Sequence, residues 1–307
     1  MRGFRTDLAM ECVAEENVPV EGVRVIAHQM GAIKHTRIII ESEDAADLLC
    51  RRCGEYITLE YLNLPKCDSK SRTLLAKLIA QGVSGMLPKQ GEVLVVGLGN
   101  RNVTADALGT RVVERMLVTR HLRQAMAPEL KDKLRGVSAI APGVLGLTGI
   151  ETAELCRGLA AHVQPAAVIA IDALAAYESE RICTTIQITN TGIEPGSGVG
   201  NHRLGLTEDT LGVRVIAVGV PMVVYASTIA RDAMARLIDE YGIFEAGHEA
   251  AAEALLKQVS EGFLGDMVVT PREIDELVLS VADLISDGLN RALQPNVDDD
   301  VLHTYLH

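Results

Sequence analysis

Runs of apolar residues alternate with amphipathic stretches along most of this chain, and their order predicts an α/β fold. Several runs are continuously apolar and end near glycine or proline, which is typical of strands covered on both faces. The predicted strands of this kind are 92–100, 136–142, 166–174, 183–189 and 213–221. Apolar residues at helical spacing predict helices over 104–126, 149–163, 224–241, 247–259 and 271–293, with Thr104 as N-cap of the first.

The alternation of strands and helices also predicts how the chain is organised into parts. Right-handed crossover connections make neighbouring strands parallel, so we expect residues 89–307 to form a mainly parallel central sheet with helices on both faces. Residues 8–88 are expected to form a smaller, β-containing N-terminal region packed on or beside this core. Its predicted elements are strands at 36–41 and 55–62 and helices at 43–52 and 69–87.

The composition narrows the classes of function. Hydrophobic residues make up 48% of the 307 residues and aromatic residues only 3%, so the core must consist mainly of Ala, Val, Ile and Leu. The net charge of −12 makes a nucleic-acid partner unexpected, because such partners require a basic surface. The chain shows neither a signal peptide nor a long uninterrupted apolar run, so we expect an intracellular protein without a membrane partner.

Six scattered cysteines are typical of reduced thiols rather than of a disulfide framework. Cys50 and Cys53 form a CxxC pair, but a structural zinc site needs four ligands, and Cys67 alone does not complete one. We therefore predict neither a metal site nor a bound cofactor.

Two aspartates follow predicted strands, where open α/β sheets gather their chemistry. Asp106 lies in the turn after strand 92–100, and Asp172 lies near the end of strand 166–174. Because the carboxyl ends of neighbouring parallel strands meet at one edge of a sheet, the two carboxylates could share a proton there. One would activate a water molecule, and the other would polarise a carbonyl group.

The surroundings of the two aspartates suggest different roles. Asp106 is expected in the first turn of a helix, where the helix dipole favours the ionised form, so we assign it as the base. Asp172 has apolar neighbours, which favour the neutral form, so we assign it as the acid. Taken alone, each residue is more simply explained as a helix cap or a turn former.

Two glycine-rich segments could bring the backbone close to a ligand. Gly97-x-Gly99 follows a strand, but Asn102 stands where the dinucleotide fingerprint has its third glycine. Residues 191–203 are also rich in glycine, but they lack the Gly-Lys-Ser/Thr ending of a phosphate loop. A non-catalytic, ligand-binding protein on an α/β sheet is therefore an alternative to an enzyme.

Blocks spread from Arg5 to about Leu293 resemble the germination proteases of spore-forming bacteria, in the same order. They include VGLGNRNVTADALGTRVV, APGVLGLTGIET, VIAIDALAA, TTIQITNTGIEPGSGVGNHR and MVVTPREID. That family consists of atypical aspartic endopeptidases that degrade small acid-soluble spore proteins at germination. The resemblance places the two catalytic aspartates at Asp106 and Asp172. We also expect substrate contacts at Gly99, Asn100, Gly198 and Asn201.

The resemblance implies several further properties. Family members are made as inactive zymogens, process themselves, and are typically tetramers, so we expect a cytoplasmic homotetramer in the developing spore. This chain departs from the family pattern at Ala105, where proline is usual. It also lacks a long insertion between about Phe244 and Gly265, which puts any role of that insertion in doubt.

A more distant similarity to hydrogenase maturation endopeptidases suggests a rival mechanism. Those relatives hold a metal with carboxylates and a histidine, so Asp106 and Asp172 could be metal ligands, with His202 as a third. This mechanism ranks second, because no histidine has a convincing spacing to either aspartate. A catalytically inactive relative that serves only as an assembly partner is a further alternative, against which the intact aspartate pair argues.

The sequence FRTDLAMEC, residues 4–12, resembles the sites at which the family cuts its substrates. Those sites have the sequence Thr-Glu, then Phe or Ile, then Ala-Ser-Glu, and are cut after the first Glu. The matching positions here are Thr6, Asp7, Leu8, Ala9 and Glu11. The expected processing site is the Asp7–Leu8 bond, with residues 1–7 as a pro-segment on an extended, accessible terminus.

Overall fold

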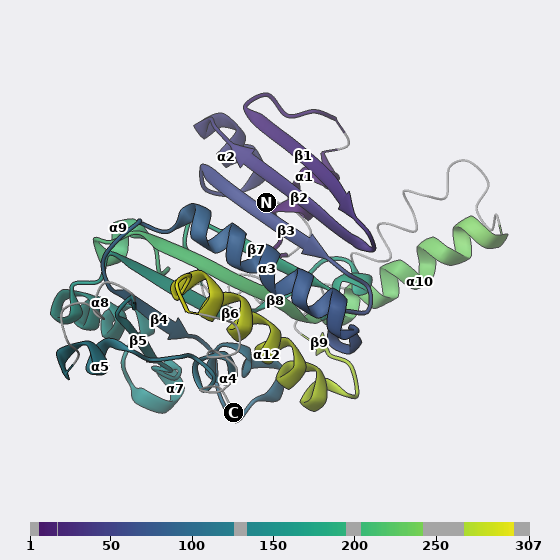
Figure 1. The fold of residues 1–307 in the computed structure, drawn as a ribbon. Coiled ribbons are helices and arrows are strands. Elements are labelled where there is room, and N and C mark those ends of the chain that lie inside the picture. Colours follow the sequence, from purple (N-terminus) through teal and green to yellow (C-terminus); the bar gives the residue numbers. More distant parts are fainter. Residues whose placement is uncertain (1–5, 17, 126–133, 195–203, 242–266, 298–307) are drawn as a thin grey trace.

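The computed structural model describes residues 6–16, 18–125, 134–194, 204–241 and 267–297 of the chain. Within them, nine strands form one mixed sheet in the order β1-β2-β3-β7-β8-β6-β4-β5, and β9 pairs with β8 (Figure 1). The strands are β1 Val23–Met30, β2 Ile33–Ile40, β3 Gly54–Glu60, β4 Val93–Gly97, β5 Val137–Ile140, β6 Ala167–Ala176, β7 Thr185–Thr189, β8 Val215–Tyr225 and β9 Val268–Val269.

The central strands are parallel, which confirms the predicted core. β4 pairs in parallel with β5 and β6, and β6 pairs in parallel with β8. The strands of the N-terminal region pair antiparallel with one another, and β3 joins them to the core through an antiparallel pairing with β7. β7 is also antiparallel to β8, because the connection from β6 is short and holds only the 3-10 helix η3 (Ser179–Arg181).

Helices cover both faces of the sheet. The long helices α3 (Ser69–Met86) and α12 (Ile274–Leu293) lie side by side against one face (Figure 1). Helix α8 (Thr152–Val163) packs against β4 in the cluster on the other face, and α10 (Ala226–Tyr241) extends away from the sheet. Other helices are α1 Ala9–Glu15, α2 Glu43–Leu49, α4 Leu108–Val113, α5 Arg120–Ala125, α7 Leu145–Thr148 and α9 Glu208–Leu211, with 3-10 helices η1 Leu64–Lys66 and η2 Thr104–Asp106.

Alternation of side chains along β6 divides the core between the two faces of the sheet. Ile171 belongs to the apolar cluster that includes α3 and α12. Val168 and Ala170 point to the other face and belong to the cluster that includes α8. Further along this second face, Leu174 belongs to a third cluster, formed with α1 and α2. Asp172 therefore lies between two apolar clusters on one face of the sheet.

The prediction of a single helix over 104–126 is wrong, because the chain leaves the helix after α4. The Leu117 N–H donates a hydrogen bond of 2.9 Å to Oδ1 of Asn290 in α12. The Thr119 N–H donates one of 3.0 Å to the carbonyl of Val137 in β5. These distant acceptors take the backbone donors that a continuous helix would satisfy internally.

Three other predictions have different outcomes. Thr104 does not act as an N-cap, because it is the first residue of η2, whose N-cap is Val103. The sequence pattern predicts no strand where β1 lies, because β1 is an edge strand with mostly exposed residues and so lacks alternation. The predicted helix over 247–259 lies outside the described residues.

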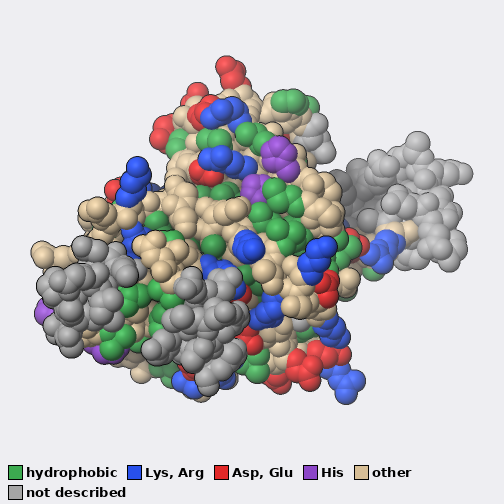
Figure 2. Space-filling view, viewed as in Figure 1, with side chains coloured by type: hydrophobic (Ala, Val, Ile, Leu, Met, Phe, Trp, Pro, Cys, Tyr) green, Lys and Arg blue, Asp and Glu red, His purple; other side chains and the backbone are tan. Residues whose placement is uncertain are grey.

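Charged side chains of both signs are mixed on the face of the molecule seen in Figure 2. The described Lys and Arg side chains on this face lie among acidic and apolar ones and do not merge into one basic stripe. Arg24 pairs with the exposed Glu41 and Arg37 with the partly exposed Glu55, and such pairs near the surface contribute little to stability. Among the described helices, none has the length and apolar character needed to cross a membrane.

Two helical glycines are expected to respond in opposite ways to replacement by alanine, because only one of them lies in the contact between α3 and α12. In Gly288→Ala, the new Cβ would lie 2.6 Å from Cγ2 of Ile79, so we expect destabilisation by about 1–3 kcal/mol. In Gly158→Ala, on α8, the new Cβ meets no atom within 4 Å, so we expect stabilisation by about 0.5–1 kcal/mol. Urea unfolding of both variants measures the difference. Equal effects would mean that α3 and α12 do not pack this closely.

Candidate active site

Asp106 is held in a tight turn after β4. It is the last residue of η2 and is half-buried, and its Oδ2 accepts a hydrogen bond of 2.8 Å from the Asn100 N–H. Gly99 has a φ of +97°, and a Cβ at this position would lie 1.9 Å from the Asp106 carbonyl oxygen. Only glycine fits such a conformation and approach. Gly99 and Asn100 thus position Asp106, while their contact with substrate stays a prediction.

Asp172 is buried in the middle of β6, at the step where β4 ends. The last pairing of β4 joins Gly97 to Ile171, so Asp172 is the first β6 residue beyond it. Its Oδ1 accepts a hydrogen bond of 2.9 Å from the Ala173 N–H. The strand was expected to end near Asp172, but it continues to Ala176, because β8 pairs with it beyond this point.

The two aspartates come from segments that contact each other. The Leu98 N–H, just before the Asp106 turn, donates a hydrogen bond of 2.8 Å to the Ile171 carbonyl, just before Asp172. At Gly109, a Cβ would lie 2.4 Å from the same carbonyl oxygen, and η2 packs against β6 and β8. The topology therefore places the turn that holds Asp106 beside the part of β6 that carries Asp172, where β4 ends. That the carboxylates act as a pair stays a prediction.

The N-terminal segment docks onto the part of β6 beyond Asp172. The Asp7 N–H donates to the Ala175 carbonyl at 2.9 Å, and the Ala175 N–H donates to Asp7 Oδ2 at 2.8 Å. The Gln187 side chain, on β7, donates from Nε2 to the Asp7 carbonyl at 3.0 Å and accepts from the Ala9 N–H at 2.8 Å. Leu8, between these contacts, is fully buried in the cluster with α1 and α2.

The expectation of an extended, accessible terminus is wrong for the described part of this segment. Thr6 and Leu8 are buried, and the chain becomes helical at Ala9, where α1 begins. Met10 and Cys12 are buried in the same cluster as Leu8, and the removal of these apolar side chains from water stabilises the docked segment. The sequence signal is weak, because a helix of only seven residues shows little periodicity.

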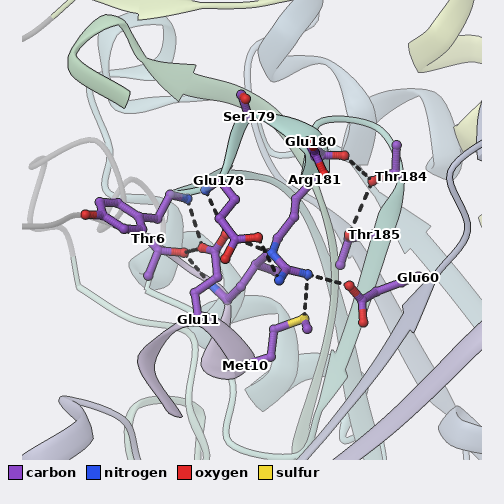
Figure 3. Close-up of polar contacts among 12 residues, drawn as sticks. Thr6, Met10, Glu11, Glu60, Glu178, Ser179, Glu180, Arg181, Thr184 and Thr185 are labelled. Atoms are coloured by element: carbon purple, nitrogen blue, oxygen red, sulfur yellow. Dashed lines mark hydrogen bonds and ion pairs between the residues drawn. The ribbon is translucent and has the colours of Figure 1, made fainter. Parts of the chain in front are cut away.

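Glu11 fastens this segment through a buried polar cluster (Figure 3). Its carboxylate accepts hydrogen bonds from the N–H groups of Tyr177 and Glu178, at 2.8 and 2.9 Å, and from the Thr6 hydroxyl. The Arg181 guanidinium lies 3.1 Å from Oε1 of Glu11. The carboxylate is therefore surrounded by donors, but it is cut off from water.

Burial raises the pKa of Glu11 from 4.5 to about 7. The hydrogen bonds from Thr6 and Glu178 and the charge of Arg181 act in the opposite direction, but they are weaker than the loss of hydration. Arg181 is also shared, because it forms ion pairs with Glu60 and Glu178 as well. The net result is a carboxyl group that changes its charge near neutral pH inside the fold.

A pocket of about 370 Å³ opens beside Asp7, between the end of α2 and the strands β7 and β8. It is lined by Arg51, Arg52, Leu174, Gln187 and Gly219 among others. Its walls mix charged and apolar groups, and Arg51 also donates to the Thr6 carbonyl at 2.6 Å. The pocket thus lies next to the predicted processing site.

The structure describes only some of the remaining residues that the sequence suggests for binding or metal coordination. Gly198, Asn201 and His202 lie outside the described residues. Cys50 and Cys53 are exposed or partly exposed. In the described ranges, no group of three or more His, Cys, Asp or Glu side chains could hold a metal ion.

The sequence gives no signal for Gln187 and Arg181 as partners of the N-terminal segment. Gln187 lies in a predicted strand, where a single polar residue among apolar ones is usually explained by local hydrogen bonding. Its partners Asp7 and Ala9 are about 180 positions earlier in the chain. Only the folded sheet brings them together.

The raised pKa of Glu11 predicts that docking of residues 6–12 depends on pH. Since the docked state has the higher pKa, the stabilisation is complete below about pH 4.5 and is lost as pH rises through about 7. Hydrogen-exchange protection of this segment should therefore be greater at about pH 5.5 than at about pH 8. The measurement is made on the Asp172→Asn variant. This variant lacks a predicted catalytic aspartate, so the Asp7–Leu8 bond is expected to stay intact during the experiment.

Glu11→Gln should remove most of this pH dependence, because an amide does not ionise. The matched control is Glu15→Gln, which changes an exposed acid on the same helix and should leave the dependence in place. Protection that varies equally with pH in both variants would exclude Glu11 as its source.

Comparisons with known proteins agree on one family. The family model described as germination protease matches residues 6–253 and 241–306, which includes the N-terminal segment and both aspartates. A germination protease from Caldanaerobacter subterraneus subsp. tengcongensis is 44% identical over 99% of this chain and 98% of its own length. One from Clostridium tetani is 39% identical over 99% of each chain.

A more diverged relative and one solved structure extend these comparisons. A germination protease from Bacillus cereus is 37% identical over 99% of this chain and 97% of its own, and the alignment is longer than this chain. That relative therefore carries residues that this chain lacks. A NiFe hydrogenase maturation protease, HycI from Thermococcus kodakarensis, matches with 17% identity and a TM-score of 0.35, over 67% of this chain and 97% of that one. On the full-length sequence matches, this chain belongs to the germination protease family and is a peptidase.

Proposed function

We propose that this chain is an endopeptidase that degrades small acid-soluble spore proteins during germination, in the spore core. Family membership supports the peptidase activity and the link to germination. The observation that carries the more detailed proposal is the docking of a substrate-like segment on β6, beyond Asp172. We propose that this segment is the chain's own processing site, cut between Asp7 and Leu8, and that the uncut chain is a zymogen.

Asp106 and Asp172 are proposed to act as a dyad on the bound peptide. One carboxylate takes a proton from a water molecule as the water oxygen bonds to the carbonyl carbon of the peptide. The other carboxyl group donates a hydrogen bond, and a proton then passes to the leaving nitrogen as the carbon–nitrogen bond breaks. Asp172 is buried and Asp106 is half-buried, and their segments are in contact. These different surroundings support a pair in which one aspartate acts as the base and the other as the acid.

The dyad predicts that both aspartates are required for self-processing. We expect the full-length chain, incubated at mildly acidic pH, to lose residues 1–7, as followed by its intact mass. Asp106→Asn and Asp172→Asn should slow this loss by about 10²–10⁴-fold, because each removes one proton-transfer group. The control Asp275→Asn changes an exposed aspartate of α12 and should process normally. Loss of the same fragment at the same rate in all four proteins would contradict the dyad.

A chelator separates this mechanism from the rival metal-dependent one. The dyad predicts that self-processing, and cleavage of a synthetic peptide with the sequence of residues 4–12, continue unchanged in EDTA. Complete loss of cleavage in EDTA, restored by a divalent metal, would instead favour Asp106 and Asp172 as metal ligands.

A further inference from the structure

Gln187 makes an unusual contact for a side chain in the middle of a sheet. Its Nε2 donates to the carbonyl of Asp7, and its Oε1 accepts from the N–H of Ala9. One carboxamide therefore binds the backbone on both sides of Leu8. If the Asp7–Leu8 bond is the one that is cut, the carbonyl that Gln187 binds is the one that water attacks.

The strand register places Gln187 in one row with Asp172. Gly219 on β8 is paired with Asp172 on one side and with Gln187 on the other. Paired residues point to the same face, so both side chains lie on the face that carries the docked segment. Neighbouring strands are about 4.8 Å apart, so the two backbones are separated by roughly 10 Å.

Because Gly219 has no side chain, the space between Asp172 and Gln187 is open to Leu174, which lies two residues after Asp172 on β6. A Cβ on Gly219 would lie 2.6 Å from Cδ1 of Leu174, which fills the gap in the row. Leu174 belongs to the same apolar cluster as Leu8. The row therefore presents an acid at one end, an amide donor at the other, and an apolar floor between them.

We propose that Gln187 is a catalytic residue that stabilises the oxyanion formed at the carbonyl of the cleaved bond. This inference rests on the proposed function. When the water oxygen bonds to the carbonyl carbon, the carbonyl oxygen becomes an anion, and the Nε2–H of Gln187 already points at it. Such a donor strengthens its hydrogen bond as the charge develops and so lowers the barrier. Oε1, bound to the Ala9 N–H, fixes which end of the amide carries the donor.

The experiment compares self-processing of full-length variants by intact mass. Gln187→Leu removes the donor with little change of size, and Gln187→Glu replaces it with an acceptor that can still bind the Ala9 N–H. We expect each to process about 10²–10³-fold more slowly than wild type near neutral pH. The control Thr185→Val alters a buried side chain of the same strand and face, whose hydroxyl lies 3.5 Å from that of Thr184, and it should process at the wild-type rate.

Two further measurements separate catalysis from anchoring. Hydrogen exchange should show that residues 6–12 stay docked in Gln187→Glu, so its rate falls while binding persists. Relative to wild type at each pH, its rate should recover as pH falls toward about 4, because a protonated carboxyl group again donates a hydrogen bond. A rate that falls only in proportion to lost docking would overturn the proposal.

The outcomes also distinguish this inference from the function on which it rests. Wild-type processing by Gln187→Glu with the segment docked, while Asp172→Asn is inactive, would remove Gln187 from the mechanism and leave the dyad standing. If wild type does not cut Asp7–Leu8, or if Asp172→Asn cuts it equally well, both the proposed self-processing and the role of Gln187 are wrong.

Discussion

The pairing of β6 with β8 continues after β4 has ended, and the candidate site depends on this step in the sheet. β4 pairs no further than Gly97 with Ile171, so Asp172 lies just beyond its end while still inside a long, rigid strand. Further along β6, Ala175 offers its N–H and carbonyl to Asp7. One strand therefore carries both the candidate acid and the dock for the segment on which it is proposed to act, and their spacing is fixed by the backbone.

Much of the core could be predicted because its signals are local. Continuous apolar runs mark the parallel strands, and the rule that chemistry gathers at strand ends selects Asp106 and Asp172. The rest depends on contacts between distant residues. The helix ends near Leu117 because Asn290 binds its N–H, and Asp7 docks because Gln187 binds its carbonyl. No short stretch of sequence contains both residues of either contact. The edge strand β1 could not be predicted for a different reason, since it buries almost nothing.

The N-terminal segment satisfies two demands with the same residues. The proposed likeness to a substrate lies in two acids that flank small and apolar residues, and these are also the residues that hold the segment in the fold. Asp7 is bound by Ala175 and Glu11 by the N–H groups of Tyr177 and Glu178, while Leu8 enters the apolar cluster. A sequence that is selected to be recognised can in this way also be selected to fold.

The complete burial of Leu8 has a consequence for the fate of the chain after hydrolysis. Cutting the Asp7–Leu8 bond would turn a neutral amide into a carboxylate on Asp7 and an ammonium group on Leu8, at a position without access to water. Two charged groups cost several kcal/mol to keep away from water unless further hydrogen bonds compensate them. The apolar packing that presents the intact bond would then oppose retention of its product, so the new terminus would be driven outward. The charges that hydrolysis creates would thus favour release of the product.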